Sequence, residues 1–143
     1  MRCLLDINVL IALLDPDHAF HQRAHAWWGG HGHSWASCPL TENGVVRIMA
    51  SAGYSKATRF TVAEIAARLS AFVEHSDHAF WPDCLSIRDT QLFQHVAILS
   101  SKHLTDLYLL ALAVENEGCL VTFDQHIPLN AVPKATPGHL VVI

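Results

Sequence analysis

The 143-residue sequence is short of charge and of long apolar runs. Charged residues make up only 15% of it, and the formal net charge is −4. No uninterrupted apolar run approaches the roughly 18–20 residues of a membrane span. The 51% hydrophobic content therefore belongs to a two-sided core or a subunit interface. The negative charge argues against a strongly basic nucleic-acid binder, but not against an enzyme that meets phosphates through a bound cation.

Paired cysteines of the CxxC type are absent as well. Cys3, Cys38, Cys84 and Cys119 are scattered singly. All but Cys84 lie in or beside segments expected to be buried strands, where a free cysteine packs as a small hydrophobe. A reduced cytoplasmic protein is the expectation. No small-residue cleavage site follows the apolar start, so a secretory signal is not expected.

The chain does contain short apolar strands that alternate with helices. Strands are predicted at 2–6, 35–38, 79–81, 119–123 and 140–143. Helices are predicted at 8–15, 17–28, 39–52, 62–75, 87–99 and 104–117, with glycines 29, 30 and 32 breaking the chain and Gly118 ending the last helix. The alternation predicts a mostly parallel sheet covered on both faces, a three-layer α/β/α fold. Without a repeat or a linker, residues 1–143 are predicted to form one domain.

Four acidic residues stand where an apolar segment gives way to a turn or helix: Asp6, Glu42, Asp106 and Asp124. Ligands bind beyond the carboxyl ends of parallel strands, so these acids are predicted to converge. Two carboxylates about 5–6 Å apart repel by roughly 3 kcal/mol at an effective dielectric of about 20. Such a cluster either takes up protons or binds a divalent cation through oxygen. We predict a metal site.

The segments that carry these acids resemble those of the PIN-domain ribonucleases, especially the VapC toxins of bacterial toxin–antitoxin pairs. The resemblance covers nearly the whole chain and rests on LLDINVLIALL, TENGVVRIM, LTDLYLLALA and LVTFDQ. It implies that Asp6, Glu42, Asp106 and Asp124 surround one or two Mg²⁺ ions, with Mn²⁺ as the alternative. Asp6 and Asp106 are expected as direct ligands. Glu42 and Asp124 are expected to bind a second ion, to bind through water or to orient the attacking water.

The resemblance also implies supporting residues. Asn8 matches a small polar residue that helps to orient the site, and Thr122 matches a hydroxyl residue near the metal. Ile7 replaces the more frequent Thr or Ser, which is expected to alter hydrogen bonding around the acids. Arg47 either reaches a backbone phosphate or pairs with a surface acid; the sequence leaves both readings open.

As a function, the resemblance implies a metal-dependent endoribonuclease toxin that cuts tRNA or ribosomal RNA at a single-stranded loop. It also implies a homodimer, silenced by a small VapB-type antitoxin whose C-terminal segment lies over the active-site groove. An acidic pocket with an apolar rim suits such a peptide, because an Arg or Lys can displace the metal.

Three other readings remain open. A haloacid-dehalogenase-type phosphatase also begins with a strand-end acid, but it needs a second Asp where this chain has Asn8. A receiver-like signalling domain needs a late lysine, and Lys102 and Lys134 are poorly placed for that. A PIN fold that only binds RNA or protein is the third alternative.

Histidine is abundant, with eleven in the chain. His18, His21 and His25 have helical spacing and are predicted to face solvent, because no cysteine lies near them to complete a zinc site. His103 lies three residues before Asp106. Contact with the substrate is the less favoured interpretation of this residue. The other acids are predicted to be solvated surface residues: Asp15, Asp17, Asp77, Asp83, Asp89, Glu64, Glu74, Glu115 and Glu117.

Overall fold

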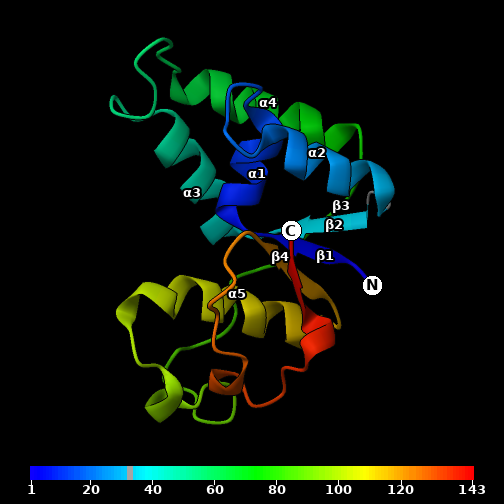
Figure 1. Ribbon diagram of the computed structural model, residues 1–143, viewed down its shortest axis with the longest axis vertical. Helices are drawn as coiled ribbons and strands as arrows, with labels where there is room; N and C mark the ends of the chain where they lie inside the picture. Colours follow the sequence, from blue (N-terminus) through cyan, green and yellow to red (C-terminus); the bar gives the residue numbers. More distant parts are fainter. Residues whose placement is uncertain (32–33) are drawn as a thin grey trace.

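The computed structural model describes residues 1–31 and 34–143, so the predicted break at Gly32 lies outside the described residues. Its centre is a five-stranded sheet in the order β3-β2-β1-β4-β5, and all neighbouring strands are parallel (Figure 1). The strands are β1 (Cys3–Leu5), β2 (Ser34–Ser37), β3 (Asp77–Phe80), β4 (Cys119–Thr122) and β5 (Leu140–Val142). The first strand of the chain and the fourth therefore lie side by side at the centre of the sheet.

Helices cover both faces of this sheet. On one side lie α1 (Ile7–Leu14), α2 (His21–Gly30), α3 (Pro39–Met49) and α4 (Val62–Glu74); on the other lies α5 (Leu104–Glu115) (Figure 1). Short 3₁₀ turns are found at His95–Ala97, Ser101–His103, Leu129–Ala131 and Pro137–His139. The predicted three-layer α/β/α fold is confirmed. Within the described ranges, no helix combines the length and the apolar character needed to cross a bilayer.

The two central strands are buried on both faces. Leu4 and Leu120 belong to the core beneath α5, whereas Leu5 and Val121 belong to the core beneath the other four helices. Side chains alternate between the faces of a strand, so β1 and the first three residues of β4 are apolar at every position. This accounts for the short uninterrupted apolar runs and the low charge content of the sequence.

The prediction of a helix at 87–99 is wrong. Only His95–Ala97 forms a 3₁₀ turn in that range. The Ser86 hydroxyl accepts a hydrogen bond from the Arg88 backbone N–H at 3.3 Å, and the Asp89 carboxylate accepts one from the Gln91 N–H at 2.8 Å. Such local side-chain acceptors stabilise turns at the expense of a helix.

Helix α5 ends at Glu115, two residues earlier than predicted. Glu117, not Gly118, adopts the left-handed conformation, with φ 55°. The Gly118 N–H donates to the Ala113 carbonyl at 2.8 Å and the Glu117 N–H donates to the Val114 carbonyl at 3.1 Å, which is a Schellman arrangement. Gly118 is needed for space: a Cβ there would lie 2.6 Å from the Arg2 carbonyl oxygen.

Near the end of α1, His25 is exposed as predicted, whereas His21 is partly buried and the prediction of a solvated Asp15 is wrong. The His21 ring lies 2.7 Å from the Ala12 carbonyl and the His25 ring 3.1 Å from the Leu13 carbonyl. These rings supply partners for carbonyls that the last helical turn leaves unpaired. Asp15 is buried and accepts a hydrogen bond from the Tyr54 hydroxyl.

Candidate metal centre

Asp6 lies at the point where β1 ends and α1 begins. It is the N-cap residue of α1, and only 6% of its surface is exposed. Its backbone N–H donates to the Val121 carbonyl at 3.0 Å, which fixes it beside the end of β4. A carboxylate is thus held at the carboxyl edge of the sheet, as the sequence predicted.

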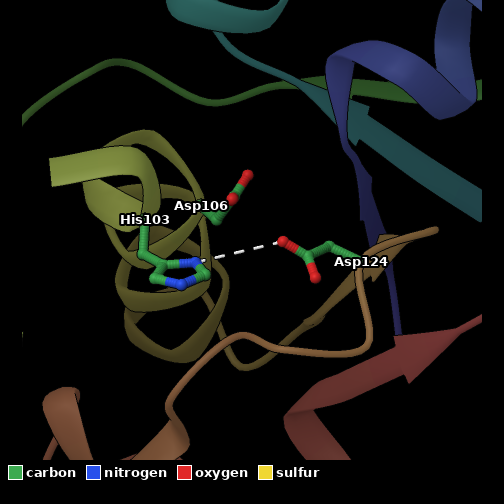
Figure 2. A group of neighbouring side chains, drawn as sticks. All are labelled: His103, Asp106 and Asp124. Atoms are coloured by element: carbon green, nitrogen blue, oxygen red, sulfur yellow. Dashed lines mark ion pairs between the residues drawn. The ribbon is translucent and has the colours of Figure 1, made fainter. Parts of the chain in front are cut away.

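Three further side chains gather at the same edge. His103 ends the 3₁₀ turn before α5, Asp106 lies in the first turn of α5, and Asp124 lies in the loop after β4. One nitrogen or oxygen atom from each lies within 4.8 Å of those from the other two. Figure 2 shows the Asp124 carboxylate pointing toward the start of α5, where His103 and Asp106 are placed. We call Asp6, His103, Asp106 and Asp124 the acid cluster.

Thr122 connects the two strand ends that carry these acids. Its hydroxyl donates to the Asp6 carboxylate at 2.9 Å and accepts from the Asp124 backbone N–H at 3.1 Å. Thr122 is fully buried, so these hydrogen bonds are shielded from water. Thr122 therefore sets the position of Asp6 relative to the loop of Asp124.

Burial and mutual repulsion raise the pKa values of two of the acids, Asp106 and Asp6. Burial raises the pKa of the Asp106 carboxyl, and the charges of Asp6 and Asp124 raise it further, to about 6. Burial likewise raises the pKa of Asp6, against the lowering effect of the Thr122 hydrogen bond, and the Asp124 charge adds to the rise. The shared Coulomb contributions place all three carboxylates within one another's field.

His103 has an unusual environment in this cluster. Its Nδ1 atom lies 3.9 Å from the nearest Asp124 oxygen, which is too long for a hydrogen bond. Among the residues that the structure describes, this buried nitrogen has no hydrogen-bond partner. A buried, unpaired nitrogen beside two carboxylates suits a cation ligand.

The structure places Glu42 in a different hydrogen-bond network. The Ser37 hydroxyl donates to the Glu42 carboxylate at 2.6 Å and lies 2.7 Å from Nε2 of His78. Because the Ser37 hydroxyl gives its one proton to Glu42, Nε2 of His78 donates to the Ser37 oxygen. We call Ser37, Glu42 and His78 the Glu42 network. It borders a groove of ≈ 370 Å³ between α3 and α4.

The remaining predicted site residues lie on helix surfaces. Asn8 is exposed in the first turn of α1, and Arg47 is exposed in the last turn of α3. Across residues 1–31 and 34–143, Arg47 has no ion pair. Ile7 packs against Gly44 of α3: a Cβ built on Gly44 would lie 2.5 Å from the Ile7 side chain. The apolar residue at position 7 therefore contacts α3.

The donor set fits a small divalent cation. Carboxylate oxygens are the preferred ligands of Mg²⁺ and also suit Mn²⁺, and imidazole is a common ligand of transition metals. The raised pKa of Asp106 marks an uncompensated accumulation of negative charge, which a cation would relieve. The sequence reasoning gave His103 only a minor role, although its spacing three residues before Asp106 places both on adjoining turns.

Comparisons with known proteins agree with this architecture. The family model described as PIN domain matches residues 3–133. Ribonuclease VapC44 of Mycobacterium tuberculosis is 45% identical over 144 residues, covering 100% of both chains. Ribonuclease VapC39 of the same organism is 38% identical over 125 residues, covering 87% of this chain and 89% of its own.

A solved structure shares the fold at low sequence identity. It is described as the crystal structure of Mycobacterium tuberculosis VapC20, a Sarcin-Ricin loop cleaving toxin. The TM-score is 0.61 at 10% identity, over 94% of this chain and 99% of the other. The chain belongs to the PIN domain family. Within that family, its similarity along the full length is to ribonucleases of the VapC group.

Proposed function

We propose that this protein is the endoribonuclease toxin of a VapBC-type toxin–antitoxin pair, formed by one PIN-like domain over residues 1–143. The observation that supports this best is the convergence of Asp6, Asp106 and Asp124, in a chain whose whole-length relatives are named ribonucleases. The substrate is structured RNA, tRNA or rRNA, cut at a single-stranded loop.

The acid cluster would hold Mg²⁺ or Mn²⁺ through Asp6, Asp106 and Asp124, with His103 as a further donor. When bound, such a cation polarises a phosphodiester and offsets the charge that builds on its oxygens. Thr122 keeps Asp6 in place by its hydrogen bond. Asn8 and Arg47, both exposed, are assigned to orienting the site and to contacting a backbone phosphate.

Glu42 is the fourth acid of the proposed quartet. In the Glu42 network its carboxylate is occupied by Ser37, so its proposed role is to bind a second ion, to bind through water or to orient the attacking water. A cation beside Glu42 would compete with the Ser37 hydroxyl for the same oxygen. We therefore propose that Asp6 and Asp106 bind the first cation and that Glu42 contributes only afterwards.

The proposed partners are RNA, a small VapB-type antitoxin and a second copy of this chain, in the cytoplasm. Leu99 is 91% exposed and Leu104 is 40% exposed, and both flank His103 in the sequence. An apolar rim beside an acidic pocket suits an antitoxin segment that carries a basic residue among apolar ones.

The experiment is incubation of the purified protein with total RNA in Mg²⁺, Mn²⁺ or EDTA, with Asp6→Asn in parallel. Discrete products that need both the metal and Asp6 are expected. Asp89→Asn is the matched control, since Asp89 is exposed in a turn outside the acid cluster. Equal cutting by Asp6→Asn would point to a contaminant. Phosphate release from small phosphomonoesters with intact RNA would favour the phosphatase reading.

A further inference from the structure

Two thiols face each other at the amino end of the central strand pair. Cys3 of β1 and Cys119 of β4 are direct register partners in the parallel ladder, and their sulfur atoms lie 3.1 Å apart. Both side chains belong to the core on the face covered by α1–α4. Neither takes part in a disulfide in this structure.

We propose that Cys3 and Cys119 form a reversible disulfide when the protein meets a peroxide. Neighbouring strands lie about 4.7–4.9 Å apart, which is within the Cα separation of roughly 4.4–6.8 Å that a disulfide spans. The sulfurs are already in contact, so closing the bond requires little movement of the backbone. The proposal does not depend on the proposed nuclease function.

The two cysteines have unequal roles in this chemistry. Cys3 is partly exposed and Cys119 is 3% exposed, so an oxidant reaches Cys3 first. The Cys119 S–H donates to the Cys3 sulfur, and the terminal ammonium and His31 add positive charge nearby; together they hold the pKa of the Cys3 thiol below its ordinary value. The thiolate is the nucleophilic form, so Cys3 attacks and Cys119 resolves.

The reaction balances with one peroxide per disulfide. The Cys3 thiolate attacks one peroxide oxygen, the O–O bond breaks, and the leaving hydroxide takes a proton to become water, which leaves a sulfenic acid on Cys3. The Cys119 sulfur then attacks the Cys3 sulfur, the S–O bond breaks, and the hydroxyl leaves as water with the Cys119 proton. Two thiols lose two electrons, and the peroxide gains them.

The disulfide would join the ends of β1 and β4 that lie opposite the acid cluster. Asp6 stands three residues after Cys3, and Thr122 stands three residues after Cys119. The bond closes a loop that spans most of the chain, so the unfolded state loses much conformational freedom. We expect the oxidised protein to melt higher by roughly 5 °C or more, and a dithiol reductant to reverse the shift.

The test uses the reduced full chain with one equivalent of hydrogen peroxide, followed by intact mass, peptide mapping and thermal melting. The expected result is the loss of two hydrogen masses, a linked pair of peptides containing Cys3 and Cys119, and the higher melting temperature. Peptide mapping of the unaltered chain decides the proposal even where a variant folds poorly.

Variants assign the roles. Cys84→Ser removes the exposed cysteine and should leave the reaction unchanged. Cys119→Ser should stop it at a sulfenic acid on Cys3 that dimedone traps, and Cys3→Ser should abolish it. Oxidation of Cys84 while Cys3 and Cys119 stay reduced would overturn the proposal. So would conversion of Cys3 to a sulfinic acid with Cys119 still a thiol.

Discussion

The acid cluster and the Glu42 network both gather ionisable side chains near the carboxyl ends of the strands, yet they differ in how their charge is satisfied. In the acid cluster, burial and the charges of neighbouring acids raise the pKa values of Asp6 and Asp106. In the Glu42 network, one carboxylate accepts a hydrogen bond from Ser37, and His78 completes the chain of contacts.

This difference indicates which of the two groups of side chains needs a bound cation. Carboxylates of both groups accept hydrogen bonds, but the acid cluster crowds three carboxylates together, whereas the Glu42 network holds a single one. The acid cluster is therefore the group that we propose for the first cation. The proposed role of Glu42 would require its carboxylate to leave the hydrogen bond with Ser37.

The largest effect is expected from Asp106→Asn, which removes one charge from the acid cluster and preserves the shape. RNA cleavage should fall by about 10³-fold or more, because a ligand of the proposed cation is lost. Cleavage rates at saturating Mn²⁺ check this, with Asp89→Asn as the control. If Asp106→Asn kept full activity, the acid cluster would no longer be distinguished from the Glu42 network as the site of the proposed cation.

Two buried hydroxyls allow a matched test of the comparison. Thr122→Val removes the donor to Asp6 and should weaken Mn²⁺ binding by about 10–100-fold, as loss of a group that orients a ligand does. Ser37→Ala removes the donor to Glu42 and should leave that affinity within about 2-fold, while it destabilises the fold by about 1–3 kcal/mol. Calorimetric titration and urea unfolding measure these effects. Equal loss of affinity in both variants contradicts the assignment.

His103→Gln should reduce Mn²⁺ affinity by about tenfold and Mg²⁺ affinity less, because imidazole favours the transition metal. Binding of Mn²⁺ followed by electron paramagnetic resonance reports this without reference to activity. His126→Gln is the control, since His126 is exposed just after Asp124. If Mn²⁺ binding is unchanged in His103→Gln, the unpaired Nδ1 has another role.

The smallest expected effect is the pH dependence of metal-free stability. The pKa of Asp106 is about 6 in the folded protein and 3.8 ordinarily, so the folded state binds this proton more tightly. Stability without metal should then fall as the pH rises through about 4 to 6. The rise in melting temperature caused by Mn²⁺ should grow over the same interval. Melting curves with and without Mn²⁺ test this, and Asp106→Asn should flatten the dependence.

The sequence predicted the layers and the convergence of three acids because those features follow from apolar strands and from acids placed at their ends. It could not predict that the Glu42 oxygen accepts from Ser37, since that contact depends on the rotamer of a helix residue beside β2. Nor could it give the turns at 86–91, where Ser86 and Asp89 oppose an apolar pattern that resembled a helix.

The role of His103 and the conformation at the end of α5 could not be predicted, for related reasons. A histidine before a helix has many ordinary roles, and only the burial of its unpaired Nδ1 singles it out. Gly118 was predicted to end the last helix; the left-handed residue there is Glu117, and a Cβ at position 118 would lie 2.6 Å from the Arg2 carbonyl oxygen. In both cases the deciding contact comes from a part of the chain that is distant in sequence.

The contact between Ile7 and Gly44 has an evolutionary consequence. Ile7 follows Asp6 directly, and Gly44 stands two residues after Glu42, so one apolar contact sets the spacing between the helices that carry the two acids. A larger residue at position 44 must be accompanied by a smaller one at position 7. The two positions should therefore co-vary among homologous sequences, and single exchanges at either one should shift both acids without touching them.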